Sequence, residues 1–286
     1  MKSLFSHSSK AVFIVVIVMM VAACSFKTMY KQLDYMIPSY VEGMVSLDSM
    51  LEEKVEQRTL VLINWHRNTQ LEQYAKWLRV FQRDASAQLT EEKMLQHIAT
   101  LDSFWKSLSL KLNEEMVRLL PLLNAEQREE LFSNIADKND EFREEYVDID
   151  NDERTEQYFD RMMDSYETWL GDLTDEQESV IKQAAAKMQA AAGLRLEHRQ
   201  QWQQSIRRII HTTDSTTQKA ASLTQYFKDF TRKKNVVLNT IDKSNRQLLA
   251  RLTVRVVHNM TAEQKVHFVS STDDYIRMFT ELAEKH

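Results

Sequence analysis

The 286-residue sequence contains one cysteine, three glycines and two prolines. A single cysteine cannot form a disulfide within the chain, so stability must come from packing. Glycine and proline usually make up about 7 and 5 per cent of a protein and supply the tight turns between strands. Their scarcity, together with many good helix formers, predicts an all-α fold, an elongated multi-helix bundle of long amphipathic helices.

The sequence also lacks the local signatures of common active sites. It has no His-Glu-x-x-His motif, no Gly-x-Ser-x-Gly motif and no glycine-rich phosphate loop. The closest pair of histidines, His258 and His267, flanks a predicted turn and does not have the i, i+3 or i+4 spacing of helical metal ligands. We therefore expect no metal, no non-covalent cofactor and no enzymatic activity.

The N-terminal segment has the three parts of a cleavable export signal. Lys2 and Lys10 precede an apolar run from Ala11 to Ala23, and small residues stand directly before Cys24. The run is shorter than the roughly 20 residues of a membrane-spanning helix. We predict a signal peptide over 1–23, a lipid-anchored segment over 24–46 and a helical domain over 47–286, with a sub-boundary near 148–153 or 171–174.

Val21-Ala22-Ala23-Cys24 resembles a bacterial lipoprotein signal. The resemblance implies cleavage before Cys24, attachment of fatty acyl chains such as palmitate to this residue, and a tether to a membrane of the cell envelope. Ser25 stands where enterobacterial inner-membrane lipoproteins carry Asp, which implies the outer membrane, with the body in the periplasm. The alternative is a buried cysteine at the end of a membrane helix.

Charge argues against a nucleic-acid partner. Removal of residues 1–23 takes away two lysines and leaves 35 basic and 42 acidic residues. Phosphate backbones are bound by concentrated Lys and Arg, whereas in this chain basic and acidic residues are interspersed. We interpret the short basic stretch at 232–234 as a solvated helix face.

Apolar residues at three-, four- and seven-residue intervals predict a succession of helices. Pro121 should end the second helix, and the acidic segment 148–153 should be a loop. Gly171 is a candidate C-cap. The expected helices cover residues 47–81, 94–119, 131–146, the segment up to 170, 175–210, 216–257 as the longest, and 262–284.

One short motif recurs at predicted helix starts. Asn or Thr at the N-cap position can accept a hydrogen bond from a free backbone N–H, and Gln three residues later can bond back to the cap. An apolar residue precedes each cap. The three copies are Leu123, Asn124 and Gln127; Leu173, Thr174 and Gln177; and Met260, Thr261 and Gln264. An ordinary capping box explains each copy locally.

The motif also carries a resemblance. Leu173 to Gln177 matches the Leu-Thr-x-x-Gln pattern of the Spy and CpxP class of periplasmic chaperones, which are helical cradles. Those chaperones are about half as long, are not typically lipid-anchored and use a basic concave face, whereas this mature chain is acidic. The resemblance implies a chaperone-like role.

A second resemblance covers most of the mature chain, to a family of Gram-negative helical lipoproteins classed only as a domain of unknown function. It implies the fold and the location without an activity. In place of the family's Leu-Thr-Pro-Glu-Gln-like element, this chain has Leu47-Asp48-Ser49-Met50-Leu51. The matching residues are Tyr30-Lys31-Gln32-Leu33-Asp34-Tyr35, Ser39-Tyr40-Val41, Asn64-Trp65-His66-Arg67, Gln73-Tyr74-Ala75 and Asn124-Ala125-Glu126-Gln127.

Trp65, His66 and Arg67 form a candidate partner surface, because Trp and Arg are enriched among binding hot spots. Helix periodicity favours a different arrangement, with Trp65 inside and the other two facing water. We expect a membrane-anchored envelope lipoprotein with a binding or scaffolding role toward envelope proteins, chaperone-like in character. The alternatives are an accessory subunit of an envelope assembly machine or enzyme, and an envelope hydrolase.

Overall fold

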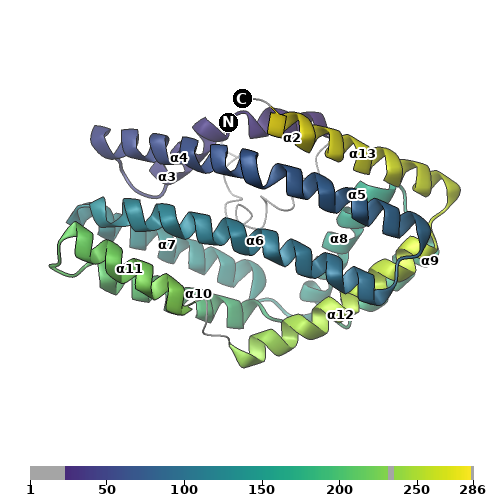
Figure 1. Cartoon of the computed structure of the whole chain (residues 1–286). Coiled ribbons are helices and arrows are strands. Elements are labelled where there is room, and N and C mark those ends of the chain that lie inside the picture. Colours follow the sequence, from purple (N-terminus) through teal and green to yellow (C-terminus); the bar gives the residue numbers. More distant parts are fainter. Residues whose placement is uncertain (1–22, 231–234, 285–286) are drawn as a thin grey trace, which may run out of the picture.

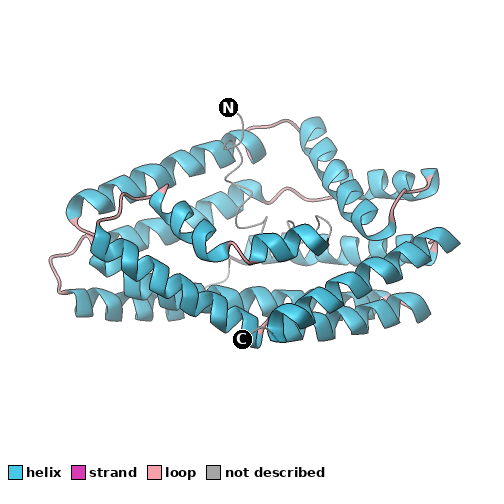
Figure 2. Ribbon diagram, turned by 90° about the horizontal axis from the view of Figure 1, so that it is seen from above, coloured by secondary structure: helices cyan, strands magenta, loops and turns pink. Residues whose placement is uncertain are grey.

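Helices joined by short turns make up the described part of the chain, residues 23–230 and 235–284 of the computed structural model (Figures 1 and 2). No strand occurs in these residues, which confirms the predicted all-α multi-helix fold. The elements are α2 (Ala23–Tyr30), α3 (Leu33–Glu42), α4 (Ser49–Thr69), α5 (Leu71–Ala87), α6 (Glu91–Leu119), the 3-10 turn η2 (Leu120–Leu122), α7 (Ala125–Tyr146), α8 (Asn151–Leu170), α9 (Asp175–Ala185), α10 (Ala192–Ile210), α11 (Thr216–Phe230), α12 (Val236–His258) and α13 (Ala262–Glu284).

The long helix α6 crosses the middle of the molecule and connects its two ends (Figure 1). At 1.5 Å per residue its 29 residues span about 43 Å. Near its start, Met94 packs against a core formed by α5, α8, α9, α12 and α13. Near its end, Met116 packs against a second core formed by α7, α10 and α11. Pro121 follows in η2, so the predicted end of this helix is confirmed.

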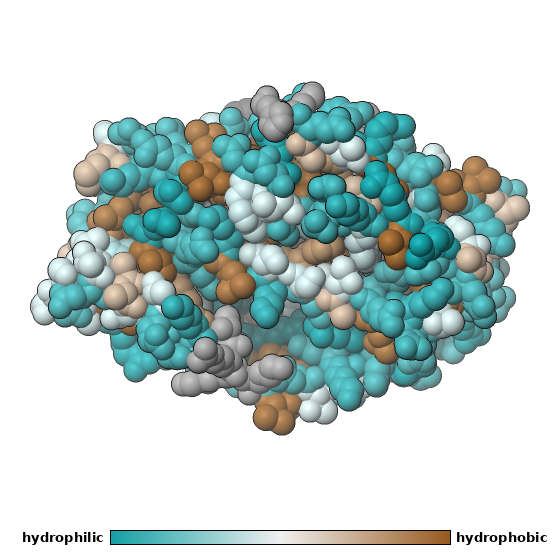
Figure 3. Space-filling model, in the orientation of Figure 1, coloured by the Kyte–Doolittle hydropathy of each residue, from teal (hydrophilic) through white to brown (hydrophobic). Residues whose placement is uncertain are grey.

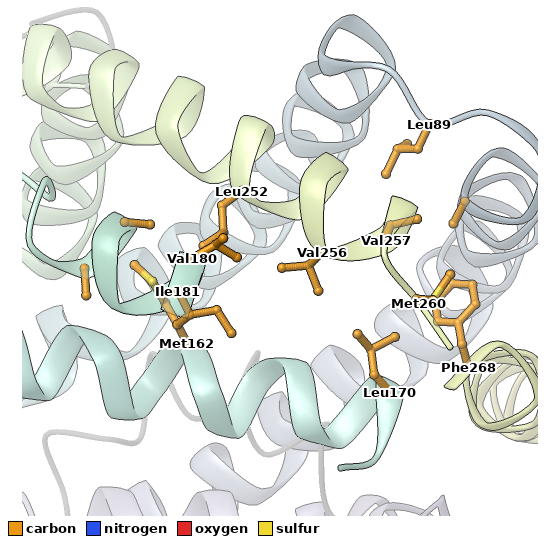
Figure 4. Close-up of a cluster of buried hydrophobic side chains, with 13 residues drawn as sticks. Leu89, Met162, Leu170, Val180, Ile181, Leu252, Val256, Val257, Met260 and Phe268 are labelled. Carbon is orange, nitrogen blue, oxygen red and sulfur yellow. The ribbon is translucent and has the colours of Figure 1, made fainter. Parts of the chain in front are cut away.

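The largest core cluster lies where α8, α9 and α12 meet. Figure 4 shows their apolar side chains pointing toward one another. Full burial of a side chain of this size contributes about 1.5–3 kcal/mol. The residues that these three helices contribute are Met162 and Leu170 from α8, Val180, Ile181, Ala184 and Ala185 from α9, and Leu252, Val256 and Val257 from α12.

The prediction of one helix over 47–81 is wrong. Two helices meet at Gln70, whose backbone N–H still donates to the His66 carbonyl oxygen at 2.9 Å while its own carbonyl accepts from Tyr74 at 3.0 Å. Leu71, the first residue after this junction, is completely buried. The buried stripe of α4 includes Thr59 and Ile63, whereas Leu62 and Trp65 are half-buried.

The prediction of one helix over 175–210 is also wrong, because α9 ends at Ala185 and α10 begins at Ala192. Asn245 of α12 holds the connection between them. Its side-chain oxygen accepts from the Gln189 backbone N–H at 3.0 Å, and its side-chain nitrogen donates to the Gln189 carbonyl at 2.9 Å. A buried polar residue of one helix therefore satisfies the backbone of a neighbouring linker.

Other helix boundaries differ from the sequence predictions in smaller ways. The expected helix over 216–257 consists of α11 and α12, and Asn235 caps α12 by accepting from the Leu238 N–H at 3.0 Å. The expected loop over 148–153 is shorter, because Asp150 caps α8. The last helix matches 262–284, and Gly171 ends α8 with a φ of 74°, which glycine adopts most readily.

Candidate functional site

Helix α2 begins at Ala23, includes Cys24 and packs directly on the body. Phe26 and Tyr30, one turn apart, are only 5 % and 3 % exposed. The Phe26 ring meets the ring of Phe279 on α13 edge-on, with centroids 6.0 Å apart. Lys27 forms an ion pair with Glu281 of the same helix. A single residue, Ser25, therefore separates Cys24 from the buried Phe26.

A histidine between two tyrosines joins α2, α4 and α5. The Tyr30 hydroxyl lies 3.0 Å from Nδ1 of His66, and Nε2 of His66 lies 3.2 Å from the Tyr74 hydroxyl. A neutral imidazole has one donor and one acceptor nitrogen, so it pairs with one hydroxyl as donor and with the other as acceptor. The network connects the segment after the candidate anchor to the body of the molecule.

Burial keeps all three groups of this network neutral near pH 7. It lowers the pKa of His66 from 6.5 to about 4. Burial raises the pKa of Tyr30 to about 12, although the nearby Arg67 guanidinium opposes this shift. Burial also raises the pKa of Tyr74. A neutral histidine between two neutral tyrosines suits a structural role, in which it holds α2, α4 and α5 together.

The structure does not assemble Trp65, His66 and Arg67 into one exposed surface. All three are half-buried. His66 points inward, toward Tyr30 and Tyr74, so the favoured interpretation that it faces water is wrong. The reason is that Tyr30 of α2 packs against this part of α4. Trp65 lies next to the His66 ring, with centroids 6.3 Å apart. The Arg67 side chain hydrogen-bonds to Tyr30.

Reciprocal capping bonds form at all three copies of the helix-start motif. At α7, Gln127 N–H donates to the Asn124 side-chain oxygen and Asn124 N–H donates back to Gln127, both at 2.9 Å. The same pair of bonds links Thr174 with Gln177 and Thr261 with Gln264. The preceding apolar residues pack inward, with Leu123 and Met260 buried and Leu173 half-buried against the largest core cluster.

The glutamines of two of these boxes bind each other. Gln177 donates to Oε1 of Gln264 at 2.9 Å, and Gln264 donates to Oε1 of Gln177 at 2.7 Å. Both side chains are almost fully buried. Gln264 also donates to the Asp172 carbonyl at 2.8 Å. The interpretation of these boxes as purely local caps is therefore incomplete, since they join the start of α9 to the start of α13.

The third box makes a different tertiary contact. The amide nitrogen of Gln127 donates to the Ser46 carbonyl at 3.0 Å, in the turn between α3 and α4. Glu130, one turn further along α7, accepts from both the backbone and the hydroxyl of Ser46 at 2.8 and 2.7 Å. The start of α7 therefore fixes the turn that connects the N-terminal helices to α4.

Periodicity did not single out a second polar cluster, at the turn between α5 and α6. The buried His97 places Nε2 3.2 Å from Asp84, and Lys93 places Nζ at the same distance from the other carboxylate oxygen. Burial lowers the pKa of His97, against the effect of Asp84. Lys93 and His97 are four residues apart, which could have indicated a shared face. Their common partner, Asp84, lies on α5 and comes close to them only because the chain turns between α5 and α6. The cluster therefore stabilises this turn.

Neither a metal centre nor a membrane span is evident in the described residues. In residues 23–230 and 235–284, no group of three or more His, Cys, Asp or Glu side chains is placed to hold a metal ion. Within the same ranges, no helix has both the length and the apolar character needed to cross a bilayer. The predicted signal peptide lies outside the described residues, apart from Ala23.

Replacement of Gln177 by Ala should lower the free energy of unfolding by about 2–3 kcal/mol, because it removes a cap and leaves buried polar groups without partners. Gln218 provides the control. It completes a capping box with Ser215 on the exposed start of α11, so Gln218→Ala should cost less than about 1 kcal/mol. Urea unfolding measures the free energy of unfolding of both variants. Equal losses of this free energy would show that the buried amide pair adds nothing to the cap.

Acid should weaken the fold through His66. Its pKa is lowered on folding, so the unfolded chain takes up a proton below about pH 6.5 while the folded chain stays neutral down to about pH 4. This residue should therefore reduce the free energy of unfolding by up to roughly 3 kcal/mol between pH 7 and pH 4.

The matched variant is His66→Gln, which keeps one donor and one acceptor but does not titrate. Urea unfolding at pH 7 and pH 4.5 should give a smaller difference for the variant than for the original chain. His97 is common to both proteins and cancels in the comparison. An unchanged pH dependence in the variant would contradict the assignment of His66 as a buried neutral group.

Comparison with known proteins identifies the family. The model of a family of unknown function, DUF6279, matches residues 44–230, which include α4 to α11. No curated protein and no solved structure matches the chain. The expected membership of an uncharacterised domain family is confirmed, whereas the lipoprotein signal and the chaperone resemblance stay predictions. The chain belongs to the DUF6279 family of unknown function.

Proposed function

We propose that this protein is a lipoprotein of the bacterial cell envelope, anchored through Cys24, with a non-catalytic binding or scaffolding role. One observation carries the proposal. An export-signal pattern ends at Cys24, and Phe26, two residues later, is buried against α13. An acyl chain on Cys24 would then hold the body directly against a membrane, and Ser25 favours the outer membrane.

The short connection supports a scaffolding role. With α2 packed and tied by Tyr30 to His66, a lipid on Cys24 would keep the body close to the membrane. A long linker would instead give a tethered body a wide range of positions. A short, fixed distance from the membrane suits a protein that presents a surface to other envelope proteins.

Exposed apolar side chains on α6 and at the start of α12 support a binding role. The face in Figure 3 is mostly hydrophilic, with apolar residues in small groups. The exposed set on the two helices includes an aromatic residue of the type enriched at protein interfaces. It consists of Leu101, Trp105 and Leu110 on α6 and Val236 and Val237 on α12.

The groove between α6 and α12 combines apolar and charged side chains. Leu95 and Ile98 of α6 line it, and Arg246 of α12 pairs with Asp102 at 2.8 Å along it. Such a surface fits a protein segment with apolar residues and mixed charge. It supports a partner or client of the protein class rather than a small molecule.

Replacement of Cys24 by Ala should abolish incorporation of radioactive fatty acid and leave an unprocessed precursor, because the acyl acceptor is gone. Ser25→Ala is the control and should be labelled normally. Ser25→Asp should move the labelled protein from the outer to the inner membrane fraction. Label that persists in the Cys24→Ala variant would refute the anchor.

A photo-crosslinking amino acid at position 105 should capture envelope proteins in intact cells. Position 178 provides the control, because Glu178 is exposed on α9, away from the α6–α12 groove. Capture of many different proteins supports the chaperone-like form of the proposal, and one stoichiometric protein supports an accessory subunit. Capture no greater than at position 178 would contradict binding through this surface.

A further inference from the structure

Helix α3 has an apolar arc that is wider than the side it packs against the body. Leu33 and Val41 pack against core clusters of the body. At about 100° per residue, the arc continues from Leu33 around the helix through Tyr40, Met36 and Tyr35. These three residues form its outer side and are 47 %, 42 % and 75 % exposed. No residue of this helix is fully buried. An exposed apolar arc of this kind usually has apolar surroundings.

The position of α3 indicates what covers this outer side. Only Lys31 and Gln32 separate it from α2, which includes the candidate lipidation residue Cys24. The eight residues of α2 span about 12 Å. Figure 1 shows both short helices, in purple, one after the other along the upper part of the molecule. A membrane that holds acyl chains on Cys24 therefore lies within reach of α3.

We propose that the outer side of α3 lies in the interfacial region of the membrane leaflet that holds the Cys24 anchor. This inference rests on the proposed lipidation. Tyrosine rings, with an apolar body and a polar hydroxyl, are enriched at this depth of a bilayer. Amphipathic helices lie in the interface plane with their apolar side about 5–10 Å into the headgroup and acyl boundary. The exposed Lys31 stands beside α3 and suits anionic lipid phosphates.

The contact gives the body a second point of attachment. A lipid anchor alone fixes one end of α2 and leaves rotation about that point. Docking of α3 in the same leaflet removes this rotation, because α3 packs on α4 and its Leu33 and Val41 side chains lie against core clusters of the body. The membrane then faces α2 and α3, and the opposite side of the molecule faces the aqueous space.

A nitroxide at position 36 tests the contact. The full-length chain, acylated on Cys24, carries Met36→Cys for labelling and is placed in vesicles of phosphatidylethanolamine and phosphatidylglycerol. The acylated sulfur of Cys24 does not react with the label. The control label is at Val237→Cys, an exposed position at the start of α12. The ratio of collisions with oxygen to collisions with a soluble nickel chelate should be several-fold higher at position 36 than at position 237.

Three outcomes separate the possibilities. An equal ratio at both positions, in protein that floats with the vesicles, would overturn the membrane contact while leaving the anchor intact. Loss of flotation of the acylated protein would instead overturn the anchor. Protection of position 36 from both reagents, with dipolar broadening between labels, would show that a second copy of the chain covers α3 and would also overturn the proposal.

A double variant adds an independent check. Tyr35→Ser with Tyr40→Ser should lower the collision ratio at position 36 toward that at position 237. Both side chains are exposed, so the unfolding curve should stay unchanged. A ratio unaffected by the two substitutions would mean that the tyrosines do not hold α3 in the interface.

Discussion

The packing of α2 against α4, α5 and α13 determines how the rest of the molecule is oriented relative to Cys24. Phe26 and Tyr30 fill the cluster that contains Tyr74, Leu78 and Phe279. Only Ser25 therefore lies between Cys24 and the packed Phe26. In the proposed lipoprotein, an acyl chain on Cys24 would act directly on the folded body, and the position of α2 would help to determine which side of the body faces the membrane.

The buried position of His66 satisfies the hydrogen bonds of its neighbours and also keeps its ring uncharged. Its ring satisfies two buried hydroxyls that would otherwise cost about 1–3 kcal/mol each. It stays neutral because burial disfavours the imidazolium ion. The residue that sequence patterns presented as a candidate contact for a partner instead closes the junction between the N-terminal helix and the body.

Helix starts in this chain also serve as tertiary contacts. The motif, Asn or Thr followed three residues later by Gln, needs only its own backbone to form a cap, and this much follows from local sequence. The cap uses one lone pair of the glutamine side-chain oxygen, so a second lone pair and both amide hydrogens are left for other partners. Gln177 and Gln264 use them on each other, whereas Gln127 uses its amide on the Ser46 carbonyl. Identical local motifs thus acquire different partners, because the packing of the helices decides which backbone or side chain lies opposite.

The sequence by itself determined the all-α class, the last helix, the helix end at Pro121 and the capped helix starts. These features depend on residues near one another in the chain, through propensity, periodicity and capping. The tertiary structure decided the break at Gln70, the split of the two longest predicted helices and the inward turn of His66. Two of these depend on partners far along the chain: Tyr30 for His66, and Asn245 for the linker after α9. Local periodicity carries no information about such partners, so the junction of the N-terminal helix with the body became visible only in the folded molecule.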